Sequence, residues 1–263
     1  MDFIERRRPA ITRAFVWRAL LAWLAVVAVF VGTRWQQIAN VEFSDIDDQL
    51  RLVQVRDLAQ GQGWFDLNQQ RINPPNGTLM HWSRLVDLPL VLTLRLLTPL
   101  LGSALAEQVM LVVVPMLLLG LALFLVARLA WRLFDLELGV LACVLLALSP
   151  PFATQFQPLR IDHHGWQIVA VLLAINGLVA RRAMLGAWIA GAAIALGLSI
   201  SLELLPIAAL LGGVLALRWF EDRGDRATLF HFSAALAVVS ALCFALTRGF
   251  ADLGAHCDAV SPP

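Results

Sequence analysis

Long apolar blocks are the feature that most limits what this chain can fold into. The hydrocarbon core of a bilayer is about 30 Å thick and takes about 20 helical residues to cross. Lipid cannot hydrogen-bond a peptide group, so a helix that pairs its own backbone is the natural way to cross it. The seven blocks are Phe15–Thr33, Glu107–Ala127, Leu136–Phe152, Trp166–Ala180, Met184–Ser201, Leu204–Leu217 and Phe230–Leu246.

The composition agrees with a membrane protein. Of 263 residues, 59% are hydrophobic and 15% are charged, whereas soluble domains have about 45–50% and 25%. We therefore predict an all-α fold, a polytopic transmembrane helix bundle of about seven spans. Residues 1–263 are expected to form a single membrane domain with a helical first external loop. The stretch Leu85–Leu101 is also apolar, but it contains two charges and two prolines. We expect it to be interfacial or re-entrant, and a true span there would change the topology.

Basic residues predict the orientation, because cytoplasmic loops are enriched in Lys and Arg. They gather at the N-terminus and after the second, fourth and sixth blocks, as Arg6, Arg7, Arg8, Arg13, Arg128, Arg132, Arg181, Arg182, Arg218, Arg223 and Arg226. This pattern places the N-terminus in the cytoplasm of a multi-pass protein of the cell inner (plasma) membrane. Residues 34–85 and 157–165 then form the first two external loops.

Both external loops carry groups that can bind metal. The first contains Asp47 and His81, and the second contains Asp162, His163 and His164. Aspartate and histidine supply oxygen and nitrogen ligands to divalent cations, and loops on one side of a bundle can meet. The alternative is that the aspartates cap helices, which are expected to begin near Asp47 and after Asp162. In an extended segment, the side chain of His163 would point away from that of His164.

These motifs, in this order, resemble the N-terminal part of the GT-C membrane glycosyltransferases, closest to the archaeal and bacterial oligosaccharyltransferase catalytic subunits. Asp47-Asp48 followed by Arg56-Asp57 is similar to their first acidic motif. Asp162-His163-His164 is similar to the second, and the run from Asn73 through Trp82 is similar to the archaeal first loop. The resemblance covers about residues 10–205, in topology more than in identity.

The resemblance implies an enzyme that transfers a sugar from a polyprenyl-phosphate-type carrier to an acceptor on the external face. A divalent cation would assist, held by Asp47, His81, Asp162 and His164. Mn²⁺ and Zn²⁺ suit this ligand set better than Ca²⁺, and Mg²⁺ stays open. Arg160 would bind the donor phosphate. Arg84 is a second candidate for that role, with an arginine that reaches toward the membrane interface as its alternative.

Glu203 is a further catalytic candidate beside Asp47 and Asp162. It lies between two apolar blocks, and an ionisable side chain within a membrane is costly unless it serves a function. Glu203 could bind or polarise the acceptor, and the alternative is a hydrated external turn. The expected partners are the lipid-linked sugar donor and the lipid bilayer, with the acceptor unknown. A net charge of +1 gives no reason to expect nucleic acid.

The chain also departs from the family. The later spans and the soluble domain with an acceptor motif rich in Trp and Asp have no counterpart, so we expect an N-terminal fragment or a reduced relative. A non-catalytic or truncated membrane scaffold of the same fold is the first alternative function. A transporter is the second, although it predicts charges or broken helices near mid-membrane. A soluble nucleotide-sugar enzyme is excluded, because the sequence lacks a glycine-rich phosphate loop.

Overall fold

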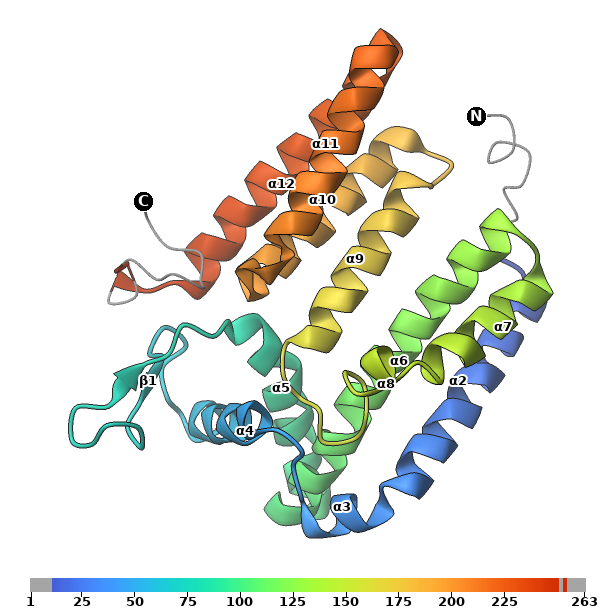
Figure 1. Ribbon diagram of the computed structural model, residues 1–263. Helices are drawn as coiled ribbons and strands as arrows, with labels where there is room; N and C mark the ends of the chain where they lie inside the picture. Colours follow the sequence, from blue (N-terminus) through green and yellow to red (C-terminus); the bar gives the residue numbers. More distant parts are fainter. Residues whose placement is uncertain (1–10, 251–252, 255–263) are drawn as a thin grey trace. The chain divides into compact units, whose positions relative to one another are not determined.

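The computed structural model describes residues 11–250 and 253–254 (Figure 1). The predicted basic cluster Arg6–Arg8 lies outside these residues. The helices, including two short 3-10 helices, are α2 (Arg13–Thr33), α3 (Trp35–Asn40), α4 (Ile46–Ala59), α5 (Arg84–Leu101), α6 (Ser103–Leu133), α7 (Leu136–Ala147), α8 (Pro150–Ala153), α9 (His164–Leu178), α10 (Ala183–Ile200), η1 (Leu202–Leu204), α11 (Leu205–Glu221), η2 (Arg223–Asp225) and α12 (Arg226–Thr247). Two short antiparallel strands, β1 (Asn68–Gln69) and β2 (Thr78–Leu79), form a hairpin.

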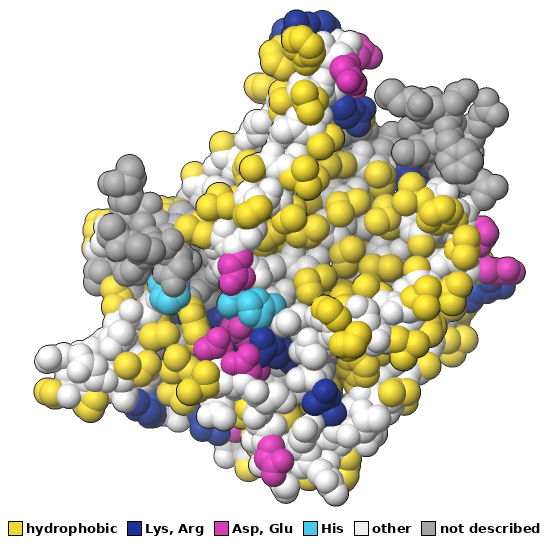
Figure 2. All heavy atoms as spheres, in the orientation of Figure 1, with side chains coloured by type: hydrophobic (Ala, Val, Ile, Leu, Met, Phe, Trp, Pro, Cys, Tyr) yellow, Lys and Arg dark blue, Asp and Glu magenta, His cyan; other side chains and the backbone are white. Residues whose placement is uncertain are grey.

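Every predicted apolar block is largely helical in the structure, which confirms the all-α transmembrane bundle. Five helical segments are long and apolar enough to cross a membrane, and α7 and α9 are shorter apolar helices. The five are Arg13–Thr33, Ser103–Leu133, Ala183–Ile200, Leu202–Glu221 and Arg223–Thr247. Hydrophobic side chains cover much of the surface that Figure 2 draws. Phe220 is 74% exposed and Leu217 is 66% exposed, as expected for helices that face lipid.

The third predicted span differs from the structure in length. Leu136–Phe152 is not one helix, because α7 ends at Ala147 and the short helix α8 begins at Pro150. Proline has no amide hydrogen, and it disfavours the helical conformation of the residue before it. The pair Pro150-Pro151 therefore ends α7 and opens α8, where proline fits the first helical turn.

Helix α5 is continuous and amphipathic. Val86, Leu90 and Leu94 are buried along one face, whereas Leu92, which is 58% exposed, and Leu96, which is 73% exposed, lie on another. Residues four positions apart share a helix face, so the exposed leucines form a stripe. The apolar helices found long enough to span a membrane do not include α5, and the stripe supports the prediction of an interfacial helix.

The described residues divide into two compact units, and α4, α5 and α9 each contribute to both. The first unit is Met1–Leu52 with Leu92–Leu172, and its core is the packing of α2, α6 and α7. Phe15 of α2 stacks on Trp131 of α6, with ring centroids 4.6 Å apart. Further along the same pair of helices, Trp23 Nε1 donates to the Met116 carbonyl at 2.8 Å. These contacts hold the beginning of α2 beside the end of α6.

The second unit is Val53–Val91 with Leu173–Pro263. Its helices α10 and α12 pack closely, because Gly191 lets the backbone of α10 approach the Phe232 carbonyl and a side chain at Gly191 would collide with it. The loop between α4 and α5 joins the end of α12. Trp64 Nε1 donates to the Leu246 carbonyl at 2.6 Å, and Arg248 donates to the His81 carbonyl at 3.1 Å.

Candidate functional site

The loop that carries Asp162 is anchored to α6 through a proline. Pro115 lies inside α6 and has no N–H to donate to the carbonyl four residues earlier. That carbonyl, of Leu111, instead accepts a hydrogen bond from the Leu159 amide at 2.9 Å. Leu159 adopts a left-handed conformation with φ of 72° and is buried. The break in the hydrogen bonding of α6 therefore fixes the backbone one residue before Arg160.

Aspartates at the beginning of α4 fix the next residues of this loop. Asp48 is buried, and its Oδ1 accepts from the Ile161 and Asp162 amides at 2.8 and 2.9 Å. Arg160 donates through Nη1 to Asp48 Oδ2 at 2.9 Å and to Asp45 Oδ2 at 2.6 Å. Two segments more than a hundred residues apart in the chain are thus joined by four hydrogen bonds to carboxylate oxygens, two from backbone amides and two from Arg160. Such charge-assisted hydrogen bonds are the stronger class.

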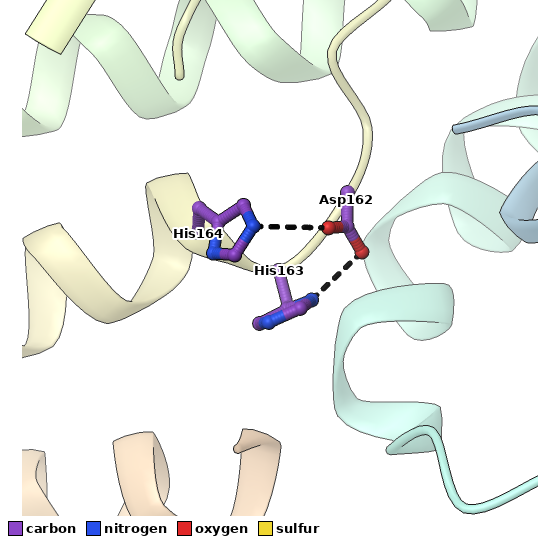
Figure 3. A group of neighbouring side chains, drawn as sticks. All are labelled: Asp162, His163 and His164. Atoms are coloured by element: carbon purple, nitrogen blue, oxygen red, sulfur yellow. Dashed lines mark hydrogen bonds and ion pairs between the residues drawn. The ribbon is translucent and has the colours of Figure 1, made fainter. Parts of the chain in front are cut away.

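The Asp162 carboxylate lies fully buried between Arg51 and His163. Arg51 of α4, itself 1% exposed, donates through Nη2 to Asp162 Oδ1 at 3.1 Å. His163 Nδ1 lies 2.8 Å from the same oxygen, as Figure 3 shows. An ionised carboxylate can only accept hydrogen bonds, so Nδ1 is the protonated nitrogen in this contact. The other oxygen, Oδ2, has no hydrogen-bond partner within the described residues.

His164 faces that second oxygen. Its Nε2 lies 3.6 Å from Asp162 Oδ2, a contact that Figure 3 draws. Its Nδ1 lies 3.3 Å from Gln167 Oε1. Because an amide oxygen accepts, this arrangement favours the tautomer with the proton on Nδ1. A metal-binding histidine commonly donates its other ring N–H in this way.

The expected orientation of His163 was wrong. The rings of His163 and His164 lie with centroids 4.2 Å apart, and both side chains turn toward Asp162. The reason is that α9 begins at His164, so the segment turns here instead of continuing as an extended strand. Gly165 lets the beginning of α9 pack closely against its neighbours, since a Cβ there would lie 2.9 Å from Leu118 Cδ2 and 3.1 Å from the Gln155 carbonyl.

Burial and neighbouring charges shift the carboxyl groups in different directions. The hydrogen bond from Arg160 lowers the pKa of Asp45, whereas burial raises the pKa of Asp48 in spite of the Arg160 charge. Burial also opposes ionisation of Asp162, but the His163 hydrogen bond and the Arg51 charge outweigh it and hold that pKa well below its ordinary value. Asp162 is therefore an anion at neutral pH.

The donor set fits a divalent cation. Ligand atoms of Asp162, His163 and His164 all lie within 4.8 Å of one another, and Oδ2 of Asp162 is buried without a hydrogen bond. Two atoms that each bind one cation at about 2.1 Å lie at most about 4.2 Å apart. The separation of 3.6 Å between Asp162 Oδ2 and His164 Nε2 satisfies that limit. These two atoms are the best-placed pair for a cation.

Asp47 and Arg160 also lie in the first unit. Asp47 is half-buried in the first turn of α4, and its amide donates to Asp45 Oδ1 at 3.1 Å. The aspartate that caps this helix is therefore Asp45. The cluster of potential metal ligands in the described structure does not include Asp47. Arg160 is paired with Asp45 and Asp48, and these ion pairs hold the two loop segments together.

The other predicted site residues lie in the second unit. His81 is half-buried with its ring at right angles to that of Trp82. Glu203 is exposed in η1, where its amide donates to the Ser201 hydroxyl at 3.4 Å. Arg84 is 1% exposed, and its guanidinium donates to Asp87, Gln62 and the Asp66 carbonyl. These contacts give Arg84 a structural role in joining α5 to the preceding loop.

Sequence reasoning did not single out Asp48 and Arg51 as site residues. Both are buried on the face of α4 that also carries Leu52 and Val55. Positions 48, 51, 52 and 55 share one helix face. Two charged residues in an otherwise apolar helical stripe are a detectable signal for buried ion pairing, because charged side chains are rarely buried unless paired. No known family model, curated protein or solved structure matches the chain.

Proposed function

We propose that this protein is an integral-membrane glycosyltransferase that transfers a sugar from a polyprenyl-phosphate-type carrier to an acceptor, assisted by a divalent cation. The observation that carries the proposal is the joining of two separate polar segments around Asp162 and His164. Asp162 is buried, ionised and has one oxygen without a hydrogen bond. Desolvating such an oxygen is costly unless a ligand or cation satisfies it.

The chain's own residues would hold this anion in position. Arg51 and His163 bind Oδ1 of Asp162, which leaves Oδ2 directed toward His164. Asp48 fixes the backbone of residues 161 and 162. Catalysis by charge stabilisation depends on groups that are oriented before the reaction begins. A bound cation would stabilise the negative charge that develops on the departing phosphate.

Asp162 and His164 are the proposed ligands whose geometry in the structure suits a cation. The sequence resemblance adds Asp47 and His81 as further proposed ligands, and it gives Glu203 a proposed role toward the acceptor. The proposed setting is the inner membrane, with a cytoplasmic N-terminus and the site on the external face. That arrangement rests on the distribution of arginines in the sequence and on the positive-inside rule.

Mn²⁺ binding tests the cation part of this proposal. The full chain in detergent should remove the electron paramagnetic resonance signal of free Mn²⁺ stoichiometrically. His164→Gln changes a ligand that is 32% exposed, so the fold should tolerate it. We expect that variant and Asp162→Asn to weaken Mn²⁺ binding by a factor of roughly 10–100 or more. Glu42→Gln, which alters an exposed carboxylate in the loop before α4, is the matched control and should bind normally.

An assay of sugar transfer tests the proposed enzymatic activity. The chain is incubated with a labelled polyprenyl-phosphate sugar and candidate acceptors, and release of the lipid phosphate is followed. Turnover that requires Mn²⁺ and disappears in His164→Gln supports the enzyme. Equal Mn²⁺ binding by the native chain, His164→Gln and Asp162→Asn would overturn the cation site. The contacts of Asp162 would then be structural, as in a non-catalytic scaffold.

A further inference from the structure

An apolar groove runs between α2 and α7, within the first unit. The two helices lie side by side (Figure 1), and they border an open groove with a volume of about 630 Å³. Ten of the twelve lining residues are apolar, among them Leu21, Val29, Phe30 and Val144. The α2 residues recur every three or four positions, so they form one face of that helix. A groove of this character beside a membrane-spanning helix suits a hydrocarbon chain.

The remaining two lining residues are charged and lie at one end. Arg18 belongs to the second turn of α2, and Glu137 belongs to the first turn of α7. The stacking of Phe15 on Trp131 places the beginning of α2 beside the end of α6, and α7 begins only three residues after α6 ends. The two charges therefore mark the same end of the groove, with apolar side chains continuing to Phe30 and Leu148.

Arg18 and Glu137 do not neutralise each other. Both side chains are exposed, and within residues 11–250 no ion pair joins them. Each can still form charge-assisted hydrogen bonds with a group of opposite charge. Two opposite charges that line one cavity without meeting leave room for a ligand that carries both complementary charges.

The dimensions of the groove match one leaflet of a bilayer. Arg18 and Phe30 are twelve residues apart, which in a helix is about 18 Å. Half of the hydrocarbon core is about 15 Å. A lipid chain lying along α2 with its head group beside Arg18 would therefore fit within a single leaflet. By the arginine distribution, that leaflet is the cytoplasmic one.

We propose that this groove is a binding site for one phospholipid whose head group carries a phosphate and a primary ammonium, as in phosphatidylethanolamine. The phosphate would accept hydrogen bonds from Arg18, which suits phosphate because its guanidinium donates in a fixed planar fork. The ammonium would donate to Glu137. A choline head group is a cation without an N–H to donate, and a glycerol head group has no cation, so of the three only ethanolamine offers Glu137 a charged N–H donor. The site does not depend on the proposed glycosyltransferase reaction.

Native mass spectrometry of the full chain tests the proposal. The protein is transferred from mild detergent into nanodiscs of phosphatidylethanolamine, phosphatidylcholine or phosphatidylglycerol, released, and weighed. We expect one retained lipid per chain, with ethanolamine preferred over choline by about tenfold, as two charge-assisted contacts allow. Arg18→Gln should lose the retained lipid. Glu137→Arg should bind the anionic glycerol head group instead, because both charges at the groove end are then positive.

Control variants separate this site from the lipids that surround any membrane protein. Arg13→Gln also removes an exposed arginine from α2, but this residue does not line the groove, so lipid retention should not change. Ala25→Trp should fill the groove and displace every lipid while leaving both charges in place. Equal retention of the three head groups would overturn the proposal in favour of surrounding lipid only. A doubled protein mass without lipid would also overturn it, because a second copy would then cover the groove.

Discussion

Two arginine–aspartate pairs in this protein differ chiefly in burial. The Arg51–Asp162 pair is almost fully buried, with side-chain exposures of 1% and 0%, whereas Arg71 is 63% exposed in its pair with Asp57. An exposed pair gains little from its attraction because water screens it. A buried pair that loses one partner leaves a charge without compensation. The two ion pairs should therefore contribute different amounts to the free energy of unfolding.

We expect Arg51→Met to lower the free energy of unfolding by about 3–5 kcal/mol. Arg71→Met is the matched control, and it should lower that free energy by at most about 1 kcal/mol. Thermal unfolding in detergent, followed by the fluorescence of the nine tryptophans, measures both. Similar midpoints for the two variants would show that the stability of the Asp162 loop does not depend on the charge of Arg51.

At the residue scale, the sequence predicted one part of the candidate site and missed another. Asp162 and His164 could be recognised because they lie two positions apart in the sequence and both residue types commonly bind metals. Asp48 accepts hydrogen bonds from the backbone amides of residues 161 and 162. Almost every residue has such an amide, so the sequence does not indicate which amides Asp48 will bind. Arg51 pairs with a residue 111 positions away. Contacts of this kind depend on the tertiary packing of α4, which local spacing does not specify.

At the element scale, the proline inside α6 determines how the loop that follows α8 is anchored. A helix with proline in its interior loses one hydrogen bond, and in α6 the freed Leu111 carbonyl is used by Leu159. Leu159 keeps a left-handed backbone, which disfavours a leucine by roughly 1–2 kcal/mol. The hydrogen bond to α6 and the buried position of its side chain stabilise that conformation.

Replacing Pro115 with alanine should loosen this loop without weakening α6. The new amide of residue 115 can donate to the Leu111 carbonyl, so it competes with the Leu159 amide. We expect faster hydrogen–deuterium exchange in residues 155–163 and equal or slower exchange in α6. Pro206→Ala is the control, because Pro206 lies in the first turn of α11, where the amide needs no helical partner. Unchanged exchange at Leu159 in Pro115→Ala would contradict the anchoring role of the Leu111 carbonyl.

Element boundaries were predictable where a single physical signal dominated. Helix α4 begins at Ile46, one residue from the predicted start near Asp47, because acidic residues favour the first helical turn. Helix α7 was predicted too long because hydropathy continues through Pro150 and Pro151. Apolar character is a property of side chains, whereas the end of α7 is set by the backbone chemistry of proline. The two signals conflict there, and the backbone effect is the stronger.

At the scale of the whole molecule, the number of membrane crossings depends on α5. This helix contains Arg84, Asp87 and Arg95, and its leucine stripe suits an interfacial position. If α5 stays on one side, then five helices cross the membrane between the β1–β2 hairpin and η2, namely α6, α7, α9, α10 and α11. Helix α7 has only 12 residues, about 18 Å, so its crossing requires the flanking residues or a thinner bilayer to make up the difference.

An odd number of crossings places the hairpin and η2 on opposite sides of the membrane, and an even number places them on the same side. The native cysteines are replaced, and Asn76→Cys and Arg223→Cys are made separately at exposed positions. In sealed vesicles of one orientation, a membrane-impermeant maleimide should label only one of the two, and detergent should expose the other. Labelling of both from the same side would mean that α5 crosses the bilayer or that one of the shorter helices α7 and α9 does not. Accessibility of a third cysteine, Phe134→Cys between α6 and α7, distinguishes these cases, because it should share the side of Arg223 if α7 and the three later helices all cross.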